Sequence, residues 1–254
     1  MSVLEFVLLL LAGLGGGLAG SVAGLASLVS YPALLATGLP PVTANVTNTV
    51  ALVLNGVGSV CASRPVLRGQ GRRMARLGVA GVLGGAVGVV LLLLTPAEAF
   101  EKLVPWLIGT AAVVILVERP PRELAAEGAA RQPHRDPWWL TVVVFVISVY
   151  GGYFGAAAGV LMLAAFLLVT GEGVPRGNAL KNVVLGIANT VAALGYVLFS
   201  TIAWAAALPL AIGFLVGGRL GPGVVRRVPQ TALRRVIAVA GLALATKLGV
   251  DAYG

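Results

Sequence analysis

The stretch GGGLAGSVAG at residues 15–24 recurs as GGYFGAAAG at residues 151–159, in each case within a long apolar region. A duplicated apolar chain with segments broken by glycine is typical of membrane transporters. The sequence therefore predicts two repeats, residues 12–110 and 147–243. Other positions recur at nearly constant spacing: Pro41 with Pro175, Asn48 with Asn182, Asn55 with Asn189, Gly84-Gly85 with Gly217-Gly218, and Pro96 with Pro229.

The composition is that of a chain in contact with lipid. Of 254 residues, 58% are hydrophobic and only 11% are charged, which leaves too little polar surface for a water-soluble globule. The net charge of +9 does not indicate nucleic-acid binding, because no soluble domain offers a basic face. The single cysteine, Cys61, excludes an intrachain disulfide.

Ten apolar segments are separated by glycine, proline or charged residues. Their continuous hydrophobicity lacks the alternation of a membrane β-barrel, so we expect an all-α integral membrane protein of about 8–10 segments. The second segment of each half is short and follows a glycine cluster, which predicts a re-entrant or broken helix. The expected segments are 3–19, 21–37, 42–62, 77–94 and 102–117, then 138–154, 156–170, 178–199, 202–218 and 233–250.

The arginines predict that the two halves are inverted. In the first half they lie between the third and fourth segments, and in the second half between the fourth and fifth. Since basic loops stay in the cytoplasm, the fourth segments should run in opposite directions, with both termini outside. We expect a first repeat at 1–117, a flexible cytoplasmic linker at 118–137 that holds His134, and a second repeat at 138–254. The arginines are Arg64, Arg68, Arg72, Arg73 and Arg76, then Arg219, Arg226, Arg227, Arg234 and Arg235.

Matched glycines indicate where a substrate would bind. Inverted-repeat carriers bind substrate at the membrane midplane, between the ends of broken helices. Gly20 and Gly24 in the first half, with Gly155 and Gly159 in the second, would let backbones approach closely and offer free amides to an anion. A single glycine more often serves helix packing, but the matched clusters favour a site.

Polar residues at the start of the third segment of each half, together with Ser27, complete the predicted site. Asparagine is costly in lipid unless its amide is partnered, so a wetted helix face and interhelical hydrogen bonding are both open. Lys181 has no acidic neighbour one turn away and would attract an anion, unless its side chain extends to a membrane interface. The residues are Thr47, Asn48, Asn178, Lys181 and Asn182.

No reactive constellation accompanies these residues. Neither metal-ligand spacing nor a phosphate-binding loop occurs in the sequence, so we expect no enzyme activity, no metal and no cofactor. The expected partners are a small anionic substrate and the lipid bilayer.

Several longer stretches form a specific combination: YGGYFGAAAGVLMLAAFLLVTGEGVPRGNALKNVV at 150–184 and GGRLG at 217–221, with GLPPVTAN at 38–45 and GGAVG at 84–88 as the duplicate. Through these stretches the chain resembles the TauE/SafE family of sulfite exporters. The resemblance implies a multi-pass prokaryotic inner-membrane carrier for sulfur-containing anions, commonly with about eight transmembrane helices. One departure is the serine-bearing stretch GSVAGLASLVSYP at 20–32, which should alter the pocket.

Together these features predict a secondary transporter. We expect export of sulfite, sulfoacetate or other sulfonates by alternating access around a midplane site. Two alternatives remain open. One is an anion channel or importer, for example of thiosulfate, and the other is a membrane scaffold that transports nothing.

Overall fold

The computed structural model describes residues 1–130, 136–224 and 230–253, and within these ranges every regular element is a helix. The all-α class is therefore confirmed. Four residues used above, His134, Arg226, Arg227 and Pro229, lie outside the described residues. The helices are α1 Val3–Ala23, α2 Ala26–Ala36, α3 Pro41–Leu67, α4 Gly71–Leu94, α5 Ala97–Val117, α6 Pro121–Ala130, α7 Trp138–Tyr153, α8 Ala158–Thr170, α9 Val174–Phe199, α10 Trp204–Val224 and α11 Gln230–Tyr253.

Seven of the described helices are long and apolar enough to cross a membrane: α1, α3, α4, α5, α9, α10 and α11. The other apolar helices, α2, α7 and α8, have 11, 16 and 13 residues. At about 1.5 Å per residue they are shorter than the roughly 30 Å hydrocarbon core. Leucine, valine and tryptophan side chains are exposed along the outside of the bundle, among them Leu94, Trp106 and Leu198, as expected where lipid is the solvent.

The breaks predicted at the glycine clusters are present, one turn later than expected in the first half. Helix α1 continues past residue 19 to Ala23 and ends at Gly24, whose φ is +76°. In the second half, α7 ends at Tyr153, and Gly155 and Ala157 have φ of +79° and +59° before α8 begins. Left-handed backbone of this kind favours glycine and stops a helix.

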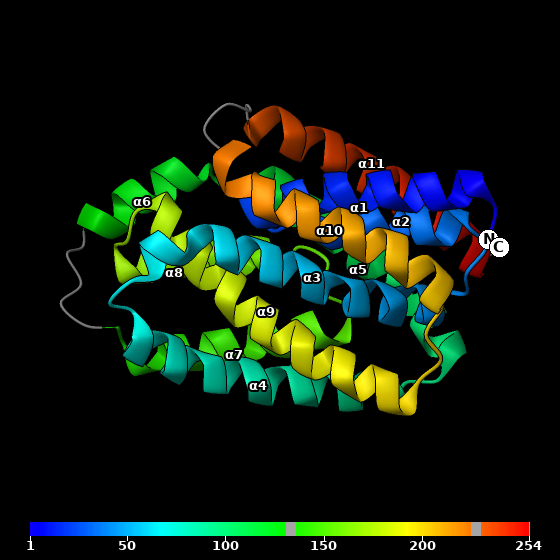
Figure 1. Ribbon diagram of the computed structural model, residues 1–254, viewed down its shortest axis with the longest axis horizontal. Helices are drawn as coiled ribbons and strands as arrows, with labels where there is room; N and C mark the ends of the chain where they lie inside the picture. The colour runs from blue at the N-terminus through cyan, green and yellow to red at the C-terminus, as the bar shows by residue number, and fades with distance from the viewer. Residues whose placement is uncertain (131–135, 225–229, 254) are drawn as a thin grey trace.

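Each break reverses the chain. Figure 1 shows α2 returning toward the end of the bundle where α1 begins, and α8 returning toward the opposite end, where α7 begins. The α1–α2 and α7–α8 pairs are therefore hairpins that enter the bundle from opposite ends. The two termini lie together at one end and α6 lies at the other.

The helices of the two halves are interleaved. Helix α1 packs along α10 and α7 packs along α4, while α3 contacts both α9 and α10. Glycines make these contacts close: a Cβ on Gly17 would lie 3.0 Å from Gly217 Cα, and one on Gly88 would lie 2.8 Å from the carbonyl carbon of Gly152. These glycines serve helix packing. An inverted repeat would produce this interleaving of helices from the two halves. The repeat itself stays a prediction.

The linker differs from the expected flexible tether. Residues 121–130 form α6, which packs against α8 through Leu124, Leu163 and Leu167. A Cβ on Gly128 would lie 3.0 Å from the carbonyl carbon of Leu167, so α6 approaches α8 closely. Pro120 and Pro121 stand at the start of this helix, where proline is well tolerated because the first turn of a helix needs no backbone N–H donor.

Candidate functional site

The turns of the two hairpins meet inside the bundle. A Cβ built on Gly24 would lie 2.5 Å from Gly159 Cα, and one on Gly159 would lie 2.9 Å from the carbonyl oxygen of Gly24. Real Cβ atoms do not approach backbone this closely, so glycine is required on both sides of the contact. The predicted close approach of the two glycine clusters is therefore a direct backbone contact.

A small cavity lies beside this contact, between the hairpin turns and helices α3 and α9. It offers about 50 Å³ in which the centre of a water molecule can lie. A single water needs roughly 10–15 Å³ on this measure, so the cavity suits a few waters or one small ion. It is lined by Gly20, Gly24, Ala26, Ser27, Leu52, Asn55, Gly56, Gly151, Gly155, Ala158, Gly159, Lys181, Asn182, Leu185, Gly186 and Asn189.

Lys181 is the charged side chain of the cavity wall. It is 1% exposed, and its Nζ donates a hydrogen bond to the carbonyl oxygen of Gly20 at 2.9 Å. It does not extend to a membrane interface, so that alternative is wrong. No carboxylate of the described ranges forms an ion pair with Lys181. Since an ammonium group has three N–H donors, two remain for other acceptors.

The end of α1 offsets part of this charge. The last carbonyl groups of a helix lack partners within the helix and carry partial negative charge. Besides the bond from Lys181 to Gly20, Asn178 Nδ2 donates to the carbonyl oxygen of Ser21 at 2.6 Å, and Asn182 Nδ2 donates to the same oxygen at 3.4 Å. A helix end supplies about half an elementary charge, so a full anion would balance Lys181 better than α1 alone.

Asn48 and Thr47, from the first half, do not line the cavity. Asn48 is 1% exposed and bonds to Ser27 and Ser30 of α2. Thr47 Oγ1 accepts a hydrogen bond from the backbone N–H of Ala203 at 3.1 Å. Asn48 and Asn178 thus form interhelical hydrogen bonds, whereas Thr47 bonds to the residue before α10. Ser27 itself lines the cavity. Asn48 is therefore connected to the cavity by its hydrogen bond to Ser27.

The structure thus brings seven of the ten predicted residues to one cavity, and their binding role stays a prediction. They are Gly20, Gly24, Ser27, Gly155, Gly159, Lys181 and Asn182. Asn55 and Asn189 line the cavity as well, although we did not include them in the predicted site. Each lies seven residues after one of the matched asparagines, Asn48 and Asn182. This repeated spacing is the feature of the sequence that could have identified them as site residues. Among the residues that the structure describes, Asn55 Oδ1 is buried without a hydrogen-bond partner.

Gly56 and Gly186 also line the cavity, and the predicted site did not include them. A Cβ on Gly56 would lie 3.1 Å from Gly186 Cα, so α3 and α9 approach each other closely at the cavity wall. Lone glycines in long helical segments carry no local signal of such a contact.

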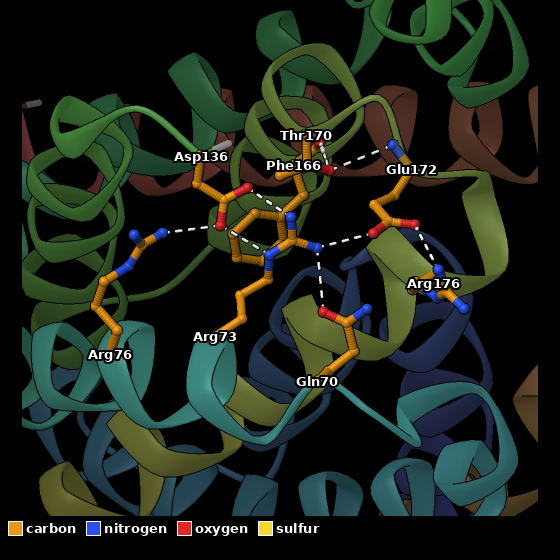
Figure 2. A network of polar contacts seen from close by, with 8 residues as sticks. All are labelled: Gln70, Arg73, Arg76, Asp136, Phe166, Thr170, Glu172 and Arg176. Atoms are coloured by element: carbon orange, nitrogen blue, oxygen red, sulfur yellow. Dashed lines mark hydrogen bonds and ion pairs between the residues drawn. The ribbon is translucent and has the colours of Figure 1, made fainter. Parts of the chain in front are cut away.

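An ion-pair network holds the α7–α8 hairpin at the end of the bundle near α6. Figure 2 shows Arg73 of α4 between Asp136, which precedes α7, and Glu172, which follows α8. Arg73 bonds Asp136 through Nε at 2.7 Å and Nη2 at 2.6 Å, and Glu172 through Nη1 at 2.8 Å. Arg76 and Arg176 add ion pairs to Asp136 and Glu172 at 2.8 and 3.0 Å. Both ends of the hairpin are therefore joined to one side chain.

Known proteins resemble this chain over almost its whole length. The family profile described as Sulfite exporter TauE/SafE matches residues 9–248. "Probable membrane transporter protein YfcA" of Escherichia coli strain K12 is 25% identical over 100% of this chain and 91% of its own length. A "Probable membrane transporter protein" of Haemophilus influenzae is 25% identical over 91% of this chain and 89% of its own length. No solved structure matches. The extent of the profile match shows that this multi-pass membrane protein belongs to the TauE/SafE family of membrane transporters.

Proposed function

We propose that the protein is a secondary transporter that exports small sulfur-containing anions such as sulfite, sulfoacetate or other sulfonates. The observation that carries this proposal is Lys181, a fully buried lysine beside a cavity, with no carboxylate paired to it in the described ranges. A buried charge without a counter-ion is unfavourable. An anion in the cavity would supply that counter-ion and could use the two free N–H donors.

The arrangement of the hairpins supports alternating access. The α1–α2 and α7–α8 hairpins enter from opposite ends, and their turns meet beside the cavity. If the two halves rock against each other, each hairpin would open the cavity toward its own end of the bundle. We assign the end that holds α6 to the cytoplasm, because Arg64, Arg68 and Arg72 are exposed near it.

The size of the cavity favours small inorganic anions in the conformation observed. Sulfite has four heavy atoms, comparable to the few waters that about 50 Å³ would hold. Sulfoacetate and longer sulfonates would require the hairpins to separate further. A membrane potential of about 100 mV, negative inside, would favour export by roughly 2.3 kcal/mol per negative charge.

A flux experiment in liposomes tests the proposal. Purified protein should move radiolabelled sulfite faster than empty vesicles, with a rate that saturates as sulfite increases. Lys181→Met, which keeps the length of the side chain, should reduce flux strongly. Lys247→Met is the matched control, because Lys247 is exposed on α11.

Other outcomes would separate the alternatives. A rate that never saturates would indicate a channel, and flux driven only inward would indicate an importer. No flux of any sulfur oxyanion from a folded wild-type protein would contradict the proposal and favour a scaffold.

A further inference from the structure

Four helix ends border the cavity, two from each hairpin. In the first half, the C-terminal end of α1 and the N-terminal end of α2 reach it through Gly24 and Ala26. In the second half, the C-terminal end of α7 and the N-terminal end of α8 reach it through Gly155 and Ala158. The residues that α3 and α9 place at the cavity lie within those helices, away from their ends. The cavity thus meets two helix ends of each kind.

The partial charges of these ends cancel. A helix carries about +0.5 elementary charge at its N-terminal end and about −0.5 at its C-terminal end, so two ends of each kind sum to roughly zero. Among the described residues that line the cavity, Lys181 is the one with an ionisable side chain. The wall as a whole therefore carries the charge of Lys181, which is one positive charge in the ammonium form.

A monoanion balances this wall better than a dianion in either protonation state of Lys181. Beside the ammonium form, a monoanion leaves no net charge and a dianion leaves one negative charge. Beside the neutral amine, the two ligands leave one and two negative charges. Since Lys181 is 1% exposed and the cavity has room for only a few waters, solvent compensates little of any excess. An uncompensated charge is costly where water is excluded.

We propose that the cavity selects singly charged oxyanions and rejects dianions, because Lys181 is matched by one negative charge. The inference rests on the proposed function, since it assigns a charge class to the ligand of that same site. Hydrogensulfite and sulfonates with a single acidic group belong to this class. The sulfite dianion does not, and neither does sulfoacetate, which carries a carboxylate as well as a sulfonate.

Three compounds of nearly equal size and shape test the effect of charge. Dimethyl sulfone, methanesulfonate and sulfate each place four groups around a tetrahedral sulfur, and at neutral pH they are neutral, a monoanion and a dianion. Isothermal titration calorimetry on the purified protein in detergent would measure their affinities. The wild type should bind methanesulfonate at least about tenfold more tightly than sulfate, as expected for one uncompensated buried charge. It should also bind methanesulfonate more tightly than dimethyl sulfone.

Two substitutions should move this preference in opposite directions. Lys181→Met removes the charge and keeps the length of the side chain, so neither anion should bind better than dimethyl sulfone. Asn189→Lys adds a second positive charge at a half-buried position of the cavity wall, so sulfate should become the tightest ligand. Asn189→Met is the matched control, because it lengthens the side chain without adding charge. It should keep the wild-type order of affinities.

The outcomes distinguish the charge selectivity from transport. If the wild type binds sulfate as tightly as methanesulfonate, the inference is wrong, and flux of sulfite in liposomes would leave the transport proposal standing. If it prefers methanesulfonate but moves no sulfite, the transport proposal fails and the selectivity stands. If it binds none of the three compounds and moves no sulfite, both fail.

The variants add a separate test of the cause. If folded Lys181→Met and Asn189→Lys keep the wild-type order of affinities, the inference is overturned, because the preference would not depend on the charge of the wall. The wild-type comparison decides the charge class by itself if a variant does not fold.

Discussion

Arg73 binds Asp136 through two nitrogens, at 2.7 and 2.6 Å, and so joins the start of α4 to the segment that leads into α7. The side chain of Asp136 is only 7% exposed and also accepts an ion pair from Arg76. Paired charges that are mostly buried lose much more than surface pairs when one partner is removed. The contact therefore holds the α7–α8 hairpin closed at this end.

Replacing Asp136 should loosen that hairpin. Asp136→Asn leaves Arg76 without a carboxylate and Arg73 with Glu172 alone, so we expect the free energy of unfolding to fall by about 2–4 kcal/mol. Thermal unfolding in detergent would measure the change. Asp251→Asn, at an exposed position near the end of α11, should shift the unfolding temperature little. Equal shifts in the two variants would show that the Arg73 pair does not hold the hairpin.

A second ion pair predicts a pH dependence. Glu118, which follows α5, bonds Arg234 at 2.9 Å. Burial raises the pKa of Glu118 from 4.5 to about 7, and Arg234 opposes this shift only in part. Between these two pKa values the folded protein holds a proton that the unfolded chain releases. The contribution of Glu118 to stability is thus present below about pH 4.5 and is lost as the pH rises through about 7.

Glu118→Gln checks that prediction, because its side chain does not titrate. Unfolding temperatures measured across this pH range should fall more steeply for the wild type than for Glu118→Gln. Parallel curves for the two proteins would contradict the raised pKa of Glu118.

The helix in the linker gives a third prediction. Leu124 of α6 is 3% exposed and packs on Leu163 and Leu167 of α8. Leu124→Ala should cost about 2–3 kcal/mol of local stability and release α6 from α8. Limited proteolysis would then cut the segment 121–130 faster than in the wild type. Leu116→Ala, at an exposed position on α5, should leave that cleavage rate unchanged.

The sequence predicted those parts of the site that local chemistry determines. Glycine clusters stop helices wherever a left-handed backbone is needed, as at Gly24 and Gly155. Lys181 could be singled out because a lysine in an apolar segment needs a partner. The ten apolar segments likewise follow from hydrophobicity and helix length, which is why the all-α membrane fold was predictable.

Tertiary packing decides the remaining features. The repeat pairs Asn48 with Asn182, which suggests equal roles, yet Asn182 lines the cavity and Asn48 is covered by Ser27 and Ser30. That difference depends on how α2 lies on α3, and no local pattern encodes it. The extension of α1 to Ala23 has a similar origin, because Lys181 and the asparagines of α9 bind its last carbonyl groups.

The contact between hairpin turns leads to a last prediction with a matched pair of glycines. Gly24 and Gly38 both have positive φ, +76° and +81°. A Cβ on Gly38 meets nothing within 4 Å, whereas one on Gly24 would collide with the backbone of Gly159. Gly38→Ala should cost only about 1–2 kcal/mol of backbone strain. Gly24→Ala adds a steric clash at the cavity and should abolish sulfite flux even in protein that still folds. Unfolding and flux measured on both variants separate the two effects: equal losses would mean that strain alone matters at Gly24, and that the contact with Gly159 is not needed for transport.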